Sequence, residues 1–168
     1  MSINVMKIGG AVLKNENGFH SLVNIIENYC RVRTVVVFSA FSNLSRTLWE
    51  WALSISKGEE TESKMKIEQA KNFLFDLIEN IIDDQNISAE TNKNIKRLFE
   101  EISRIFYGVS ITKELSPRTL DKILSFGEQV SAIVLQSYLK SRSIDARFIG
   151  AEQIIITDEN FGAAQPLI

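Results

Sequence analysis

The first part of the chain alternates between short apolar runs and one amphipathic stretch. Residues 3–8 are mostly apolar and lead into two glycines, a pattern that predicts a short strand. Apolar side chains recur at helical spacing within residues 18–29 and predict a helix. Residues 34–39 are β-branched and apolar on both faces, as in a strand buried inside a parallel sheet. A strand, a helix and a strand in this order form a βαβ unit, which predicts an α/β domain with a mainly parallel sheet.

The middle of the chain is helical by its pattern. Apolar stripes at helical spacing lie within residues 44–55, 65–82 and 95–106. The polar segment 83–88 separates the last two stripes, so these two helices are expected to pair as an antiparallel hairpin. Gly108 follows the last stripe and is expected to end that helix as a C′ glycine.

A further helix is predicted to begin at Ser116-Pro117. Serine suits the N-cap, and proline suits the first helical position because no N–H is needed there. This helix is expected to reach about Lys140 and to be followed by strands at residues 146–149 and 153–157. No internal repeat or linker interrupts the pattern, so the chain is interpreted as one domain.

Composition and charge narrow the class of protein. The chain has 168 residues, of which 45% are hydrophobic and 24% charged, enough for one domain with a sizeable core. A formal net charge of -2 argues against nucleic acid as a partner. The longest apolar run is too short to span a bilayer, so no membrane partner is expected. A single cysteine, Cys30, and the lack of a signal-peptide pattern predict a cytoplasmic protein.

Lys7 is the first candidate for chemistry. It lies at the exit of a predicted parallel strand, where ligands of α/β proteins bind, and Gly9 and Gly10 follow after Ile8. Glycines allow backbone N–H groups to approach a phosphate, and an oriented ammonium can neutralise phosphoryl oxygens. The alternative is a solvated lysine followed by an ordinary turn.

The segment after the second predicted strand is rich in hydroxyl groups. Ser39, Ser42 and Ser45 lie within it, again at a strand exit. Hydroxyl and N–H groups there can orient a carboxylate or a phosphate. The alternative is that Ser42 caps the helix that begins near Asn43, and both roles are compatible.

Glu128 lies on the flank of the apolar face of the helix that begins at Pro117, beside Gly127 near the centre of that face. A glycine inside a helix costs about 1 kcal/mol relative to alanine. Gly127 is therefore best explained by close packing or by room for a ligand. By itself, Glu128 is more commonly a solvated carboxylate than a ligand-binding one.

Together these segments resemble the aspartokinases of the amino-acid kinase superfamily. Residues 7–10 resemble the opening K-F-G-G motif, and residues 35–40 resemble the second strand and its loop. Residues 115–128 resemble the L-S-x-R-T…S-F-G-E segment, and residues 156–164 resemble the I-I-T-D-x-N-F-G-x-A segment. These two motifs separate aspartokinases from the uridylate, carbamate and acetylglutamate kinases. The resemblance covers nearly the whole chain.

This resemblance implies a fold and an activity. The fold would be a truncated three-layer αβα sandwich of the carbamate kinase-like type, with a helical hairpin insertion at about residues 58–110. The activity would be ATP-dependent phosphorylation of the side-chain carboxylate of L-aspartate to aspartyl phosphate. That reaction is the first step of lysine, threonine and methionine synthesis. ATP with Mg²⁺ would be the cofactor of the parent enzyme, and no metal site is expected in this chain.

The resemblance also implies residue roles on the phosphate side of the site. Lys7 would be catalytic and stabilise the transferring phosphoryl group. Gly9 and Gly10 would bind phosphate through their backbone donors.

On the substrate side, Ser39 would line the site, and Ser45 matches a family threonine that contacts aspartate. Glu128 would bind the α-ammonium group of aspartate, a role that suits a carboxylate beside an apolar face.

Departures from the family pattern bear on activity. Ala11 and Val12 stand where the family usually has Thr and Ser, and Asn43 replaces a glycine. No Gly-Arg-Gly-Gly-Ser-Asp-like segment, which supplies a catalytic aspartate and most of the nucleotide pocket in the family, occurs in the sequence. Residues 1–168 are therefore expected to be the N-terminal portion of a catalytic domain, without the nucleotide-binding half or regulatory domains. Such a chain would be inactive alone and would not bind ATP tightly.

Two other interpretations stay open. A non-catalytic amino-acid-binding subunit or sensor, which Ala11 and Val12 favour, would bind aspartate without nucleotide. A truncated product with an exposed sheet edge would aggregate or form a homo-oligomer through that edge. His20, the only histidine, has no ligand cluster around it in the sequence, so a zinc site is not expected.

Overall fold

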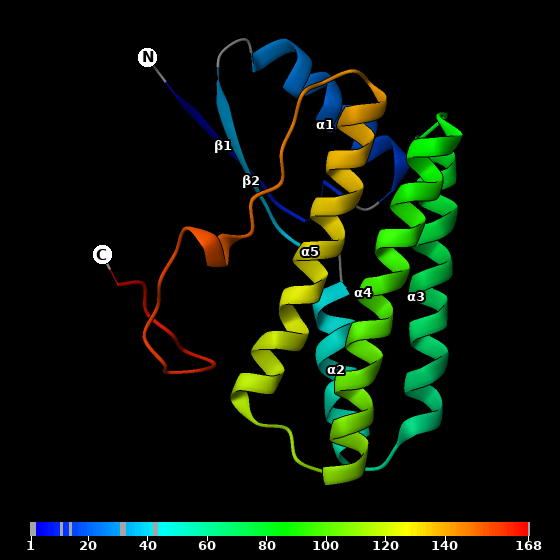
Figure 1. Cartoon of the computed structure of the whole chain (residues 1–168), viewed down its shortest axis with the longest axis vertical. Coiled ribbons are helices and arrows are strands. Elements are labelled where there is room, and N and C mark those ends of the chain that lie inside the picture. The colour runs from blue at the N-terminus through cyan, green and yellow to red at the C-terminus, as the bar shows by residue number, and fades with distance from the viewer. Residues whose placement is uncertain (1–2, 11, 14, 31–32, 42–43, 168) are drawn as a thin grey trace.

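The computed structural model describes residues 3–10, 12–13, 15–30, 33–41 and 44–167. A small parallel sheet lies beside a bundle of long helices (Figure 1). In chain order the elements are β1 (Asn4–Ile8), α1 (Glu16–Tyr29), β2 (Thr34–Phe38), α2 (Leu44–Ser56), α3 (Glu60–Ile81), α4 (Gln85–Thr112), α5 (Pro117–Ser141) and the 3-10 helix η1 (Ala151–Gln153).

The two strands form the predicted βαβ unit with α1. β1 and β2 pair in parallel, with Lys7 opposite Val37 and Ile8 opposite Phe38. Because side chains alternate between the faces of a sheet, Ile8 and Phe38 share one face, and that face packs against the hydrophobic core. The carboxyl ends of both strands therefore lie at one edge of the sheet.

The opposite face of the sheet is open in this chain. Val5, Val35 and Val37 on this face are 73%, 49% and 49% exposed, respectively. The prediction that residues 34–39 are buried on both faces is therefore wrong for the described chain. The physical reason is that the helices pack against only one face of these two strands.

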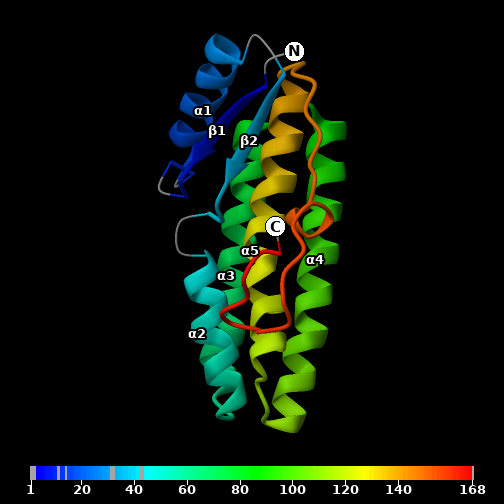
Figure 2. The same ribbon diagram turned by 90° about the vertical axis from the view of Figure 1, so that its left-hand side faces the viewer.

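The four helices α2 to α5 form a bundle beside the sheet (Figure 2). Helices α3 and α4 run antiparallel through a short turn, which confirms the predicted hairpin. Helix α5 contacts both α2 and α4, and α1 contacts α3. None of the described helices combines the length and the apolar character needed to cross a bilayer.

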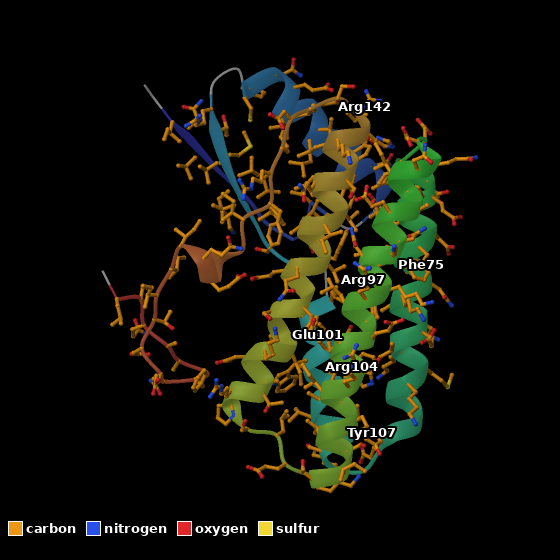
Figure 3. The ribbon with its side chains drawn as sticks, viewed as in Figure 1. Phe75, Arg97, Glu101, Arg104, Tyr107 and Arg142 are labelled. Carbon is orange, nitrogen blue, oxygen red and sulfur yellow. The ribbon has the colours of Figure 1, made fainter. Side chains whose placement is uncertain are left out.

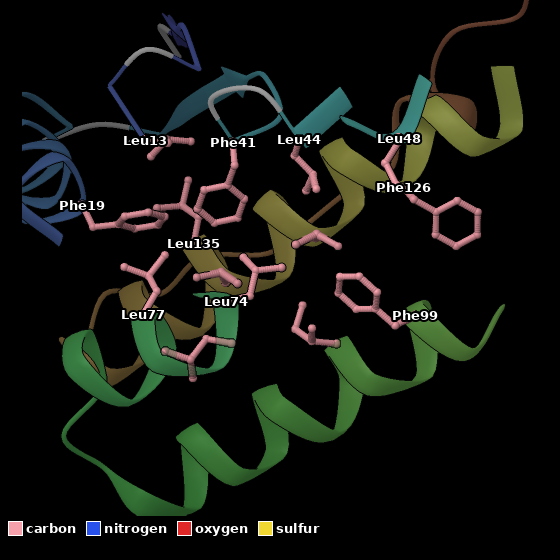
Figure 4. Packing of buried hydrophobic residues seen from close by; sticks show 14 of the residues in the cluster. Leu13, Phe19, Phe41, Leu44, Leu48, Leu74, Leu77, Phe99, Phe126 and Leu135 are labelled. Carbon is pink, nitrogen blue, oxygen red and sulfur yellow. The ribbon is translucent and has the colours of Figure 1, made fainter. Parts of the chain in front are cut away.

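Aromatic side chains connect the sheet side of the core to the bundle (Figure 4). The ring of Phe19 in α1 lies 5.4 Å from that of Phe41 and 6.2 Å from that of Tyr138, measured between centroids. Farther along the bundle, the rings of Trp51 and Phe106 are 4.7 Å apart. The buried residues thus form one continuous cluster from α1 to α5.

The outer side of α4 carries several charged side chains. Arg97, Glu101, Arg104 and Tyr107 project from α4 away from the core (Figure 3), and all are exposed. The apolar stripe of α3 is shorter than predicted, because Met65 and Phe73 are 61% and 49% exposed. Helix α3 packs on the bundle mainly through its C-terminal half, where the buried residues are Leu74, Leu77, Ile78 and Ile81.

Polar caps begin three of the helices. The Asp84 carboxylate accepts hydrogen bonds from the amides of Asn86 and Ile87, at 2.9 and 3.1 Å, at the start of α4. Ser116 accepts from the Thr119 amide at 3.2 Å, which confirms the predicted start of α5. The Asn15 side chain accepts from the Gly18 amide at 3.2 Å, so α1 begins at Glu16, earlier than predicted.

Gly108 does not end α4, contrary to the sequence-based prediction. The helix continues to Thr112 and ends at Lys113, whose φ of 56° is left-handed. The apolar stripe resumes directly after the glycine, because Val109 is only 3% exposed. Burial of Val109 therefore holds the next turn in the helix, despite the low helix propensity of glycine.

The strands predicted after α5 are not formed. Residues 144–150 have no regular structure, and Ala151–Gln153 form a 3-10 turn. Beyond that turn only one isolated bridge, Thr157 with Pro166, is present among the described residues. A strand needs a neighbouring strand that offers hydrogen bonds, and Figure 1 shows this segment (orange to red) as an extended loop.

Candidate functional site

The candidate site lies where β1 and β2 end, at the edge of the sheet at which α/β proteins bind ligands. The Ser39 amide donates to the Ile8 carbonyl at 3.3 Å and joins the two strand exits. The structure brings together here the glycine turn after β1, the loop after β2, the first turn of α2 and the middle of α5.

Lys7 extends from the open face of β1 toward the glycine turn. Its side chain is exposed, and its Nζ is 4.0 Å from the position that a Cβ on Gly9 would occupy. The ammonium therefore lies over the backbone of the turn. An ammonium beside a glycine backbone is a suitable arrangement for a phosphate oxygen.

Gly10 is required by a close approach between two loops. A Cβ at this position would overlap the carbonyl oxygen of Ala40. The turn itself closes through hydrogen bonds from the Val12 amide to the Gly9 carbonyl at 3.0 Å and from the Leu13 amide to the Gly10 carbonyl at 3.1 Å. Leu13, 1% exposed, anchors the turn in the core.

The loop after β2 carries the predicted hydroxyl groups to the same place. Ser39 is partly buried, and its Cβ is 3.7 Å from the ideal Cβ position of Gly10. Ser45 lies in the first turn of α2 and faces α5. Ser42 and Asn43, like Ala11, lie outside the described residues, so the expectations for them stay predictions.

Gly127 allows α5 to approach this loop closely. A Cβ on Gly127 would lie 2.9 Å from the Ser45 Oγ and 3.1 Å from the Ala40 Cβ, both tighter than ordinary contact. Close packing, one of the two explanations that the sequence allowed for this glycine, is therefore confirmed. The glycine sets how near α5 comes to the hydroxyl-bearing loop.

Glu128 follows Gly127 and is exposed at the rim of the site. Within the described part of the chain, no hydrogen bond or salt bridge engages its carboxylate. Lys7 beside the Gly9 turn and Glu128 beside Gly127 thus contribute one positive and one negative group to the elements that meet here. Such a pair suits a ligand that carries both an anionic and a cationic group.

Sequence reasoning missed Ser131, one turn after Gly127 on α5. Its side chain is fully buried at 0% exposed. Its Oγ accepts a hydrogen bond from the Phe41 amide at 2.8 Å and donates one to the Gly127 carbonyl at 2.9 Å. A polar residue inside the apolar stripe of α5 was the signal that could have identified it.

His20 lies away from this site and pairs with Tyr138. The His20 Nδ1 and the Tyr138 hydroxyl are 2.5 Å apart, and burial raises the pKa of Tyr138. Among the described residues, no group of three His, Cys, Asp or Glu side chains could hold a metal ion.

Two cavities lie within the helical bundle. A cavity of about 430 Å³ lies between α3 and α4, with Lys71, Lys96 and Arg104 in its lining. A second cavity of about 240 Å³ adjoins it and is lined by apolar side chains such as Trp51 and Phe106.

Known proteins are similar to this chain over nearly its whole length. The model of the amino acid kinase family matches residues 2–165. Lysine-sensitive aspartokinase 3 of Escherichia coli (strain K12) is 26% identical over 162 residues, which cover 96% of this chain and 34% of that protein. Chloroplastic aspartokinase 2 of Arabidopsis thaliana is 28% identical over 168 residues, which cover 97% of this chain and 29% of that protein. The chain spans about a third of the length of these curated relatives.

Solved structures share the fold. The T-state crystal structure of E. coli aspartokinase III in complex with lysine and aspartate has a TM-score of 0.82 and 25% sequence identity, and the match covers 98% of this chain and 35% of that chain. The R-state structure with aspartate and ADP has a TM-score of 0.80 at 23% identity. The α/β fold of the amino-acid kinase type and the resemblance to aspartokinases are thereby confirmed. Because the family model matches nearly all of its residues, the chain belongs to the amino acid kinase family.

Proposed function

We propose that this chain forms the aspartate-binding part of an aspartate kinase, which transfers the γ-phosphoryl group of ATP to the side-chain carboxylate of L-aspartate. The observation that carries this proposal is the convergence of Lys7 with the Gly9-Gly10 turn, and of Ser45 with Gly127, at the ends of β1 and β2. The similarity to aspartokinases over nearly the whole chain supports it.

In this proposal Glu128 binds the α-ammonium group of aspartate. The hydroxyl groups of Ser39 and Ser45 orient its carboxylates. A charge-assisted hydrogen bond at the apolar rim of α5 is stronger than one in bulk water, which suits the recognition of a zwitterion. Together these groups would hold the side-chain carboxylate as a nucleophile next to the glycine turn.

Lys7 and the glycine turn would act on the phosphoryl group. The Lys7 ammonium would neutralise the charge that develops on the transferring oxygens, and the amides of Gly9 and Gly10 would donate to them. The aspartate carboxylate attacks directly, so no covalent enzyme intermediate is needed. Lys7 and the turn fit the phosphate end of ATP, and Mg²⁺ bound to ATP would add further charge neutralisation.

We further propose that residues 1–168 correspond to the N-terminal portion of a catalytic domain, with residues 58–110 as a helical insertion. The nucleotide pocket would then need additional polypeptide. On this proposal the chain binds aspartate, does not bind ATP tightly and is inactive alone. A place at the start of lysine synthesis and a cytoplasmic location stay predictions of the same resemblance.

Calorimetric titration with L-aspartate tests the proposal directly. Glu128→Gln removes the charge but keeps the shape, and the loss of a charge-assisted hydrogen bond should weaken binding about tenfold or more. Glu79→Gln, on the exposed face of α3, is the matched control and should bind as the unchanged chain does. Equal affinity of all three proteins would exclude Glu128 as the ammonium-binding group.

A non-catalytic sensor is the second candidate function. The observation that favours it is Val12, which is 40% exposed at the glycine turn and offers no hydroxyl group where the family usually has one. A sensor would bind aspartate and would show no ADP or ATP binding even when the rest of a catalytic domain is supplied. Nucleotide binding under those conditions would leave the kinase as the sole candidate.

A further inference from the structure

The buried hydroxyl of Ser131 joins the loop after β2 to α5. Ser131 is 0% exposed and has Val130 and Ala132, at 3% and 2%, as its neighbours in sequence. A hydroxyl in such surroundings loses its hydrogen bonds to water. Its burial therefore destabilises the fold unless both its donor and its acceptor form hydrogen bonds within the protein.

Both are used. The single proton of Ser131 Oγ is donated to the Gly127 carbonyl at 2.9 Å, so a lone pair is left to accept from the Phe41 amide at 2.8 Å. The bond to Gly127 remains within α5, whereas the bond to Phe41 crosses to the loop. The internal bond therefore fixes the rotamer in which the hydroxyl can hold the loop.

We refer to the hydrogen bond from the Phe41 amide to the Ser131 hydroxyl as the Ser131 contact, and other close contacts lie beside it. Ala40, the residue before Phe41, packs against the Gly10 backbone on one side and against Gly127 on the other. A displacement of Ala40 from α5 would therefore change the packing at both Gly10 and Gly127.

Ser131 and Glu128 are three residues apart on α5 and lie on adjacent parts of its surface. One turn of α5 thus carries both the Glu128 carboxylate and the Ser131 hydroxyl that bonds the loop after β2. Fixing this turn against the loop fixes the separation between Glu128 and the hydroxyl groups of Ser39 and Ser45.

We propose that Ser131 is a positioning residue that sets the distance between the ammonium-binding Glu128 and the carboxylate-binding loop, and so selects aspartate by length over glutamate. This inference rests on the proposed function. Ser131 itself does not touch the substrate. An alanine would fill nearly the same space, so the hydroxyl is explained by the two bonds rather than by packing.

The test compares three variants of the chain under reducing conditions. Ser131→Ala removes both bonds, and Ser131→Cys replaces the hydroxyl with a slightly larger thiol, which is a much weaker donor and acceptor. Ser141→Ala is the matched control, because the Ser141 hydroxyl also lies on α5 and donates to a backbone carbonyl of the preceding turn, that of Tyr138 at 2.7 Å. Calorimetry measures the dissociation constants for L-aspartate and L-glutamate at equal folded fractions, and NMR measures hydrogen exchange of the Phe41 amide.

We expect Ser131→Ala to weaken aspartate binding about tenfold and to reduce the ratio of aspartate to glutamate affinity, because the Phe41 amide is left without its acceptor. Exchange of the Phe41 amide should accelerate at least tenfold, Ser131→Cys should lie between serine and alanine, and Ser141→Ala should change neither quantity. A general loss of stability would weaken both ligands equally and would overturn the selectivity role.

The outcomes separate this inference from the proposed function. If the unchanged chain binds no aspartate, the proposed function fails and the ligand role of Ser131 fails with it. If the unchanged chain binds aspartate and Ser131→Ala keeps the same affinity and selectivity, the inference alone is overturned.

Discussion

The helical bundle buries its apolar side chains, whereas one face of the sheet leaves its apolar side chains exposed. In the bundle, Trp51 of α2, Ile102 of α4 and Ile123 of α5 are 2%, 2% and 0% exposed. On the open face of the sheet, Val5 and Val35 are 73% and 49% exposed. The bundle completes its core within this chain, and the sheet does not.

The difference follows from the geometry of the two elements. An amphipathic helix has one apolar stripe, and a neighbouring helix is enough to cover it. A strand of a parallel sheet is apolar on both faces and needs a layer on each. The candidate site lies at the end of the less complete region, whereas most of the stability is expected from the bundle.

The largest expected effect is a truncation inside the bundle. Ile123→Ala removes a fully buried side chain and should lower the free energy of unfolding by about 2–5 kcal/mol, because a cavity is left in α5. Val35→Ala, on the open face, should cost less than about 1 kcal/mol. Urea unfolding of both variants measures this contrast, and similar losses would show that the sheet face is covered in solution.

Two glycines in helix interiors should respond in opposite directions. Gly127→Ala places a Cβ 3.1 Å from that of Ala40 and should cost about 1 kcal/mol after the gain in helix propensity is subtracted. Gly108→Ala meets nothing within 4 Å and should stabilise the chain by up to about 1 kcal/mol. Thermal unfolding checks the signs, and stabilisation by both would mean that α5 can move away from the loop.

Alkaline pH should destabilise the junction between α1 and α5. Burial raises the pKa of Tyr138 above its usual value, Arg142 lowers it, and Glu27 and Asp83 raise it further. This contribution to stability is complete below the unfolded pKa of about 10 and is lost as pH rises through the folded value.

Tyr138→Phe tests this dependence through unfolding curves measured at pH 8 to 11. The variant should lose its hydrogen bond to His20 at every pH but show a flatter decline at alkaline pH. Tyr107→Phe, at a side chain that is 69% exposed, is the matched control and should keep the decline of the unchanged chain. A decline that is equal in all three proteins would rule out Tyr138 as its source.

The smallest effect is expected on the outer face of the bundle. Glu101 and Lys122 form a salt bridge of 3.5 Å between α4 and α5, with both side chains about half exposed, at 50% and 52%. Glu101→Gln should change stability by less than about 0.5 kcal/mol, because exposed ion pairs are screened by water and salt. A loss comparable to that of Ile123→Ala would mean that charge rather than apolar burial holds α4 and α5 together.

Local signals in the sequence were sufficient to predict that the helices and the strands β1 and β2 exist and roughly where they lie. Periodicity predicted the α3–α4 hairpin, and Ser116-Pro117 predicted the start of α5, because caps and apolar stripes are encoded within a few turns of one segment. The prediction at Gly108 was wrong because the burial of Val109 outweighs the preference of one glycine. The strands predicted at 146–149 and 153–157 do not form, because a strand needs a neighbouring strand for its hydrogen bonds.

In the candidate site too, some features follow from the sequence and others only from the tertiary structure. The amino-acid sequence by itself determined where the candidate residues stand, because Lys7, the glycine pair and Glu128 lie at predictable ends of strands or faces of helices. Only the tertiary structure decided that Gly10 and Gly127 touch the same residue, Ala40, and that Ser131 holds the loop between them. Those contacts join segments far apart in the chain, and steric fit between such segments leaves no local pattern in the sequence.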